Sequence, residues 1–213
     1  MTRHTPAALL AAALLCGSGA AFAQVPGNFT GAEILPVNAH MFGGYLVASN
    51  NVVGGLAQLR LSFYPGVDFG FQGGLARLNY TGGDRTSLRL GTDLKVRVRA
   101  ATEQSLYDIA VGGALGVETG DDLSNLAVGP VVVASRSFGA SSTGGFMTYA
   151  GVGAMFSSVD AGKLKETNLT VPLRIGALFK ASPGIHLVTE IQFLVGDNFN
   201  DDVSFTAGVN MPF

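Results

Sequence analysis

The chain has 213 residues, of which 47% are hydrophobic and only 13% are charged, and its formal net charge is −2. This length suits one domain, while the charged fraction is about half of the ~25% that soluble domains usually carry. Because the sequence contains neither a basic cluster nor a stacking-aromatic motif, nucleic-acid binding is not expected.

Residues 1–23 have the pattern of a cleaved signal peptide. Arg3 and His4 form a short basic region, residues 7–16 are apolar, and residues 21–23 match a small-x-small cleavage site. The apolar run is too short to span a membrane as a helix. Lipidation of the only cysteine is the alternative, but a leucine precedes it where a small residue is expected. Cleavage would leave a mature chain without disulfides or thiolate metal ligands.

The segment 24–40 follows, and it has no regular hydrophobic period. It contains several proline and glycine residues, which interrupt helices and strands alike. We interpret it as a periplasmic leader or as a partial plug of the lumen, in front of a single domain at residues 41–213.

Two uncharged stretches, at residues 34–59 and 137–159, are long enough to be considered as membrane helices. Both are interrupted by glycine pairs and polar residues, so neither is a continuous apolar segment. The period that recurs along the domain is two, which is the period of a strand with one apolar and one polar face. The segment 87–100 is the clearest case, with leucine and valine alternating with arginine, aspartate and lysine.

Ten such segments can be counted, at residues 41–49, 56–64, 67–78, 87–100, 106–118, 125–137, 145–157, 167–180, 185–195 and 203–213. Four short connections alternate with five that are generally longer and more polar, as in membrane barrels. We therefore predict an all-β fold, a closed antiparallel transmembrane β-barrel of ten strands with both termini in the periplasm. Eight strands is the alternative, and the orientation of 125–137 and 145–157 stays open because both faces are apolar or small.

A soluble sandwich would also alternate, but two features favour the barrel. The strands are about 9–13 residues long, which suits a tilted strand crossing hydrocarbon, and the polar face is rich in small residues and opposite charges. The side chains expected to face lipid are Leu59, Leu61, Phe63, Phe69, Phe71, Leu88, Leu90, Val96, Ile109, Leu173, Ile191, Phe205 and Met211.

The last eleven residues alternate apolar with small or polar residues and end on phenylalanine. With the signal peptide and the strand pattern, this ending resembles the small bacterial outer-membrane β-barrel proteins, without indicating one family. The resemblance implies a place in the bacterial outer membrane, contact with its lipid and lipopolysaccharide, and recognition by the barrel-assembly machinery. The assembly signal would map to Phe205, Val209, Met211 and Phe213. Pro212 departs from the usual pattern, although a strand end tolerates proline.

A charge ladder is predicted on the lumen face, formed by Arg89, Asp93, Lys95, Arg97, Arg99, Asp108, Glu118, Arg174 and Glu190. Folding 87–100 and 106–118 as a hairpin pairs Arg99 with Asp108 and Arg89 with Glu118. On a later hairpin, Arg174 can reach Glu190 or Gln192, while Lys180 can lie beside His186.

The ladder fits a structural or interaction barrel whose interior charges are paired, because an unpaired buried charge is costly. A small passive pore with mild anion preference is the alternative, since the inward cations that can be placed outnumber the acids. A lipid-modifying barrel enzyme is a remote alternative. His186 and Glu190 would lie roughly 13 Å apart along one strand, so no catalytic residue is predicted. We also predict no metal site and no cofactor, and the sequence does not indicate an oligomeric state.

Overall fold

The computed structural model describes residues 29–80, 83–102, 105–121, 123–139, 145–161, 164–196 and 203–213. The predicted signal peptide lies outside these residues. Strands make up nearly all of the described chain: β1 (His40–Ala48), β2 (Val52–Tyr64), β3 (Val67–Tyr80), β4 (Gly83–Arg99), β5 (Asp108–Gly120), β6 (Leu123–Phe138), β7 (Phe146–Gly153), β8 (Met155–Ala161), β9 (Leu164–Ser182), β10 (Ile185–Gly196) and β11 (Val203–Pro212). Within the described part of the chain, no helix is long and apolar enough to cross a membrane.

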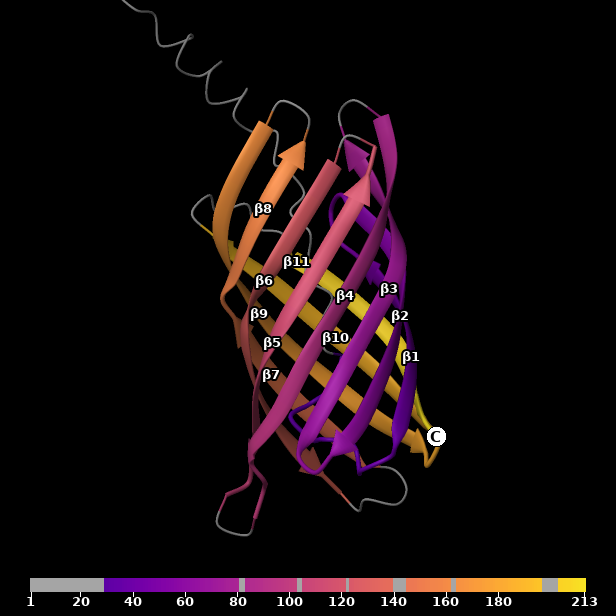
Figure 1. Ribbon diagram of the computed structural model, residues 1–213. Coiled ribbons are helices and arrows are strands. Elements are labelled where there is room, and N and C mark those ends of the chain that lie inside the picture. The colour runs from indigo at the N-terminus through magenta and orange to yellow at the C-terminus, as the bar shows by residue number, and fades with distance from the viewer. Residues whose placement is uncertain are drawn as a thin grey trace, which may run out of the picture.

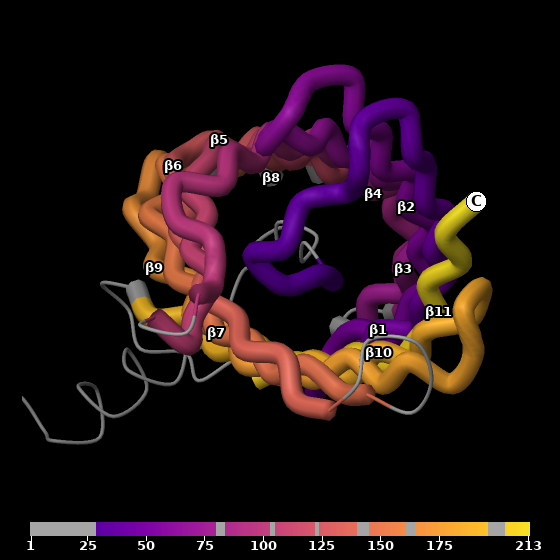
Figure 2. The backbone as a smooth tube through the Cα atoms, turned by 90° about the horizontal axis from the view of Figure 1, so that it is seen from below, coloured from indigo at the N-terminus to yellow at the C-terminus, as the bar shows by residue number. Residues whose placement is uncertain are grey.

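The strands form one closed antiparallel barrel (Figure 1). Neighbouring strands pair in sequence order, except that β7 and β8 both pair with β6 and β9 and not with each other. β11 closes the sheet by pairing with β1, where Phe42 lies opposite Met211. Looking down the barrel, the wall surrounds an interior that the N-terminal part of the chain enters (Figure 2). We call the end with the β2–β3 turn, the β9–β10 turn and the C-terminus the proximal rim, and the opposite end the distal rim.

β7 and β8 are two halves of one barrel strand, so the predicted count of ten is confirmed. Val131 pairs with Gly153 and Val128 with Phe156, which is the same register on both sides of Ala154. The interruption has a local cause in Pro130 of β6, which accepts a hydrogen bond from the Ala154 N–H at 3.1 Å but has no N–H to return. Pro172 of β9 lies beside the same point and also lacks a donor.

Side chains alternate between the outer face and the interior as predicted. Every residue expected to face lipid has its side chain on the outside of the barrel, exposed or half-buried. The orientation that the sequence left open is now defined, because Asn125 and Val131 of β6 and Tyr149 of β7 are buried inside. On the terminal strand, Asn210 is buried in the lumen while Phe213 is exposed on the outside.

Two of the distal connections are shorter than the sequence suggests. β3 and β4 continue to Tyr80 and Gly83, and β8 and β9 continue to Ala161 and Leu164. The polar residues that were assigned to loops therefore extend the strand pairing beyond the apolar band. An exposed ion pair between Arg77 and Asp84 lies on this extension.

The missing donor at Pro130 gives a testable prediction. Replacing Pro130 by valine supplies an N–H facing the Ala154 carbonyl, so Pro130→Val should raise the free energy of unfolding by about 1 kcal/mol. Urea unfolding of the protein refolded in lipid vesicles measures this change. Ala134→Val, on the same face of the same strand, adds apolar volume without a hydrogen bond and is the matched control. A Pro130→Val variant no more stable than this control would contradict the explanation.

Candidate functional site in the barrel lumen

Residues 29–35 lie inside the barrel (Figure 2), and we call this segment the plug. Phe29 and Ala32 are almost completely inaccessible to solvent, at 2% and 0% exposure. The sequence left open whether residues 24–40 form a periplasmic leader or a partial plug, and the described residues 29–35 take the second arrangement. Residues 24–28 lie outside the described part of the chain.

Lys95 of β4 makes the densest set of contacts with the plug. Its ammonium group donates to the carbonyl oxygens of Gly31 and Glu33, at 2.7 and 2.9 Å, and to Oγ1 of Thr30 at 3.2 Å. An ammonium group has three hydrogens, and all of them can be used here. Because Lys95 is only 1% exposed, these plug atoms replace water around a buried charge.

Two further side chains bind the plug backbone from distant parts of the wall. The Ala32 N–H donates to Oγ of Ser135 at 2.9 Å, and Nδ2 of Asn210 donates to the Phe29 carbonyl at 3.0 Å. These contacts connect the plug to β6 and to the closing strand β11. The backbone polar groups of a segment without secondary structure are thereby satisfied by wall side chains.

Apolar packing also holds the plug against the wall of the barrel. The Phe29 ring stacks on Tyr45 with centroids 4.1 Å apart. Gly31 fits only because it has no side chain, since a Cβ there would meet the Met147 sulfur. The cluster that fills this level of the barrel comprises Phe29, Tyr45, Val47, Leu56, Met147, Leu178 and Val188.

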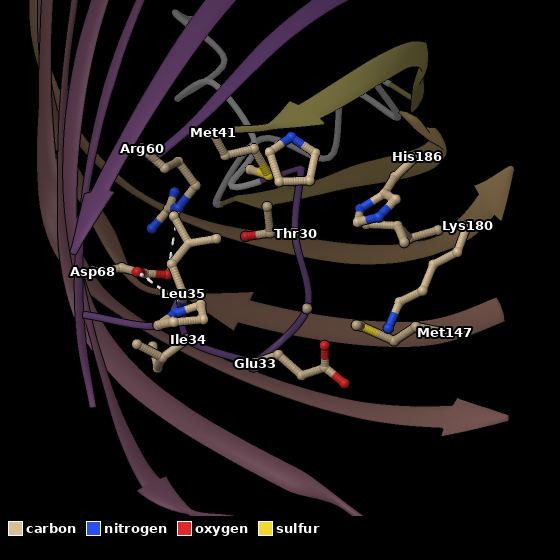
Figure 3. A pocket seen from close by; sticks show the side chains of 14 residues that line it. Thr30, Glu33, Ile34, Leu35, Met41, Arg60, Asp68, Met147, Lys180 and His186 are labelled. Atoms are coloured by element: carbon tan, nitrogen blue, oxygen red, sulfur yellow. Dashed lines mark hydrogen bonds and ion pairs between the residues drawn. The ribbon is translucent and has the colours of Figure 1, made fainter. Parts of the chain in front are cut away.

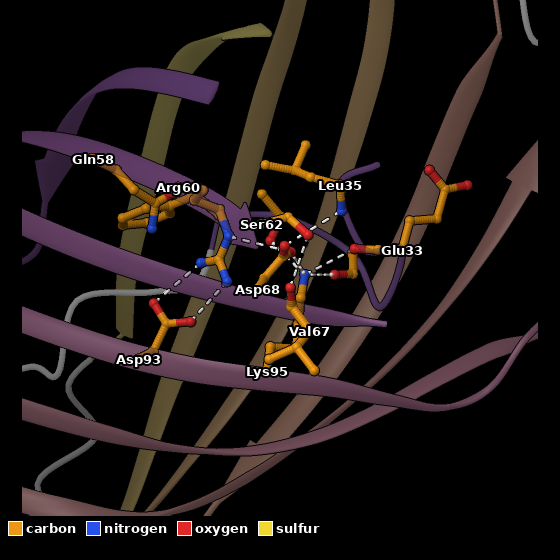
Figure 4. A network of polar contacts seen from close by, with 12 residues as sticks. Glu33, Leu35, Gln58, Arg60, Ser62, Val67, Asp68, Asp93 and Lys95 are labelled. Atoms are coloured by element: carbon orange, nitrogen blue, oxygen red, sulfur yellow. Dashed lines mark hydrogen bonds and ion pairs between the residues drawn. The ribbon is translucent and has the colours of Figure 1, made fainter. Parts of the chain in front are cut away.

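A four-charge cluster lies beside the plug (Figure 4). Arg60 binds Asp93 through two hydrogen bonds of 3.1 and 2.9 Å, and Asp68 lies 3.7 Å from Arg60 and 3.4 Å from Lys95. Asp68 also accepts the Leu35 N–H at 3.3 Å, which joins the cluster to the plug. Two cations and two carboxylates balance each other, as burial requires.

Arg60 and Asp68 were counted among the inward charges but left out of the predicted charge ladder, although they are the best-connected charges of this cluster. Asp68 is the direct register partner of Lys95 across β3 and β4. Gly70 lies between Arg60 and Asp93, where a Cβ would meet both side chains. Placing β3 against β4 in register would have shown the first pairing, whereas the second depends on the space that Gly70 leaves.

The remaining members of the ladder form two smaller groups. Arg89 donates to Glu118 at 2.9 Å, as the hairpin register predicts, and Ser87 donates to the same carboxylate oxygen at 2.6 Å. On β9 and β10, Arg174 donates to Gln192 at 2.9 Å, while Glu190 accepts the Tyr149 hydroxyl proton at 3.0 Å. The group around Glu118 lies nearer the distal rim. The group on β9 and β10 faces the interior from the opposite wall.

The predicted pair of Arg99 and Asp108 does not form. The register of β4 and β5 shifts between Arg97 and Arg99, so that Arg99 lies opposite Ile109. Asp108 instead accepts the Ala101 N–H at 3.0 Å. Arg99 therefore shares the outward face with Ile109, whereas Arg97 is still in register with the inward-facing Ala110. Both arginines are exposed at the proximal rim.

The expected excess of positive charge in the lumen is also wrong. Among the described residues, four cationic and five acidic side chains are buried: Arg60, Arg89, Lys95, Arg174, and Asp68, Asp93, Asp108, Glu118, Glu190. Three of the cations that were placed inward lie at the proximal rim, where Lys180 is half-buried and Arg97 and Arg99 are exposed. The buried charges therefore give no basis for an anion-selective lining.

Several buried polar atoms near the distal half have no hydrogen-bond partner within the described residues. They include Oε2 of Glu118, Nη2 of Arg89 and both amide atoms of Asn125. Buried groups of this kind are bound to internal water in most proteins. This part of the lumen is thus polar and suited to hold water.

Buried ion pairs of the charge cluster should contribute much more to the free energy of unfolding than exposed ion pairs do. Asp93→Ala should lower the free energy of unfolding by about 3–5 kcal/mol, because it leaves Arg60 buried without its bidentate partner. Asp84→Ala, which breaks the exposed pair with Arg77, should change it by less than about 1 kcal/mol. Urea titrations of both variants in vesicles make the comparison. Equal effects of the two substitutions would show that the cluster does not stabilise the fold.

Comparison with known proteins agrees with this architecture. No protein-family model and no curated protein matches the chain. Among solved structures, the β domain of the Bordetella autotransporter Brka superposes with a TM-score of 0.56 at 12% identity, covering 83% of this chain and 100% of that domain. The KdgM porin (TM-score 0.44, 9% identity, 81% and 99% covered) and an outer-membrane channel from Pseudomonas putida (0.45, 13%, 88% and 99%) are more distant. The chain has the fold of bacterial outer-membrane β-barrel proteins, and the likeness at this identity concerns the fold alone.

Proposed function

We propose that this chain is an outer-membrane β-barrel of structural or interaction type, whose charged lumen is closed by its own plug. The observation that carries the proposal is the set of three hydrogen bonds from Lys95 to the plug. Withdrawal of the plug would leave this ammonium group, already next to Arg60, without most of its hydrogen-bond acceptors. That cost favours the closed lumen as the resting state.

The outer surface supports a membrane setting. A continuous apolar face surrounds the barrel, and exposed aromatic side chains such as Tyr107 and Phe213 lie near strand ends, where membrane barrels carry aromatic girdles. Closure of the sheet removes the unpaired edges that hydrocarbon does not tolerate. We place the protein in the bacterial outer membrane with the proximal rim and both termini in the periplasm. Its partners would be membrane lipid and lipopolysaccharide, and during assembly the machinery that recognises the terminal strand.

A small passive pore is the second candidate, and one observation favours it. The atoms of Glu118, Arg89 and Asn125 that have no hydrogen-bond partner among the described residues indicate a hydrated distal lumen, which would conduct if the plug left the barrel. The balance of buried charges argues that such a pore would have no anion preference. A catalytic role is not part of either proposal.

Planar-bilayer recordings separate the two candidates. Wild-type protein should give no conductance steps, whereas Lys95→Met, which removes all three plug hydrogen bonds, should give frequent openings. Lys165→Met removes an exposed lysine at the distal end of β9 and is the matched control, expected to stay silent. Steady steps from the wild-type protein would contradict the closed resting state. Silence of Lys95→Met and of a variant lacking residues 29–35 would show that the plug does not close the lumen.

Single-cysteine labelling tests the orientation. Lys165 and Ala181 are exposed at the distal and proximal ends of β9, and the mature chain has no other cysteine if the signal peptide is removed. A membrane-impermeant maleimide should label Lys165→Cys on intact cells, and Ala181→Cys only after the outer membrane is permeabilised. The reverse pattern would place the proximal rim outside the cell.

A further inference from the structure

A cavity of about 220 Å³ lies between the plug and the part of the wall formed by β9 and β10 (Figure 3). Lys95 and Asp68 bind the plug from the β3–β4 side of the barrel. The cavity reaches Leu178, Lys180 and His186 on β9 and β10, near the proximal rim. Lys180 and His186 at its border are half-buried, so the cavity is open to solvent there.

Two nitrogen donors from adjacent strands face this cavity. His186 of β10 lies directly opposite Lys180 of β9, as the hairpin register predicts, and both side chains point toward the space beside the plug (Figure 3). Neither side chain makes a hydrogen bond or ion pair with any residue of the described ranges. The neighbouring charges differ in this respect, since Arg60 is bound by Asp93 and Asp68 by Lys95.

The other walls are mostly apolar. Met41, Met147 and Leu178 border the cavity from three different strands. Glu33 is the acidic group of the plug that borders it, and its carboxylate accepts the Ser137 hydroxyl proton at 2.6 Å. Lys180 and His186 thus present nitrogen donors to a cavity whose other walls are mainly thioether and aliphatic. Its further charged groups are Glu33 and the mutually paired Arg60 and Asp68.

We infer that this cavity is a binding site for a small organic carboxylate with a compact apolar body. Lys180 and an imidazole N–H of His186 would donate to the two carboxylate oxygens, which is a charge-assisted arrangement. The apolar body would lie against the two methionines, whose sulfur atoms make favourable contacts with aromatic rings. A cavity of about 220 Å³ is large enough for a single ring. The site does not require the lumen to conduct, and it goes beyond the proposed structural role.

The probe for this site is 4-fluorobenzoate, observed by ¹⁹F NMR with the refolded full-length mature protein in detergent micelles. The fluorine resonance should shift saturably with protein, and Lys180→Met should weaken the affinity by about tenfold, because it removes the charged donor. His186→Ala should weaken it several-fold on the same grounds. Lys165→Met, the same substitution at the other end of β9, should bind like the wild-type protein. The neutral analogue 4-fluorobenzyl alcohol should show only the non-saturable partition that empty micelles also show.

Three results would overturn the inference. They are no saturable shift with the wild-type protein, equal affinities of the wild-type and both donor variants, and saturable binding of the alcohol as strong as that of the carboxylate. Gel mobility of unheated and boiled samples reports whether each variant has folded as a barrel. If one donor variant does not fold, the other decides the outcome. None of these results depends on the conductance recordings, so the closed lumen and the anion site can fail separately.

Discussion

The structure depends on one constraint, that the strand backbone must satisfy its own hydrogen bonds where no water is available. Pairing of β11 with β1 satisfies this constraint for the whole sheet, because it removes both sheet edges. Closure then creates an interior, and the polar face of each strand is directed into it because the outer face is apolar. The long cationic side chains, the aromatic residues and the plug are three ways of filling the same space.

The plug and the charge cluster stabilise each other. Lys95 is buried because the plug covers it, and the plug can lie in the interior because Lys95, Ser135 and Asn210 satisfy its backbone. Asp68 joins both systems through Lys95 and the Leu35 N–H. A change in any of these groups therefore affects the interior as a whole, in contrast to the exposed ion pairs at the distal rim.

Much of the fold could be predicted because a barrel strand carries its own orientation in its alternation. The ten strands, the outward residues and the pairing of Arg89 with Glu118 follow from period two and from hairpin register. The pairing of Arg99 could not be predicted, because one irregularity after Arg97 reverses the face of the sheet on which the following side chains lie. The role of Lys95 could not be predicted either, because its partners are main-chain carbonyls of an aperiodic segment more than sixty residues away. Local pattern determines the wall, while the contents of the lumen depend on contacts between distant parts of the chain.

The contact between Phe29 and Asn210 has a consequence for the order of folding. These residues are 181 positions apart, and Asn210 belongs to the strand that closes the barrel. The first described segment of the chain can therefore reach its final place only when the last strand is present. Insertion of the plug is expected to be a late event, since contacts of such high sequence separation form slowly. A barrel with an empty interior would then precede the closed one during biogenesis, and the seated plug would mark the molecules whose wall is complete.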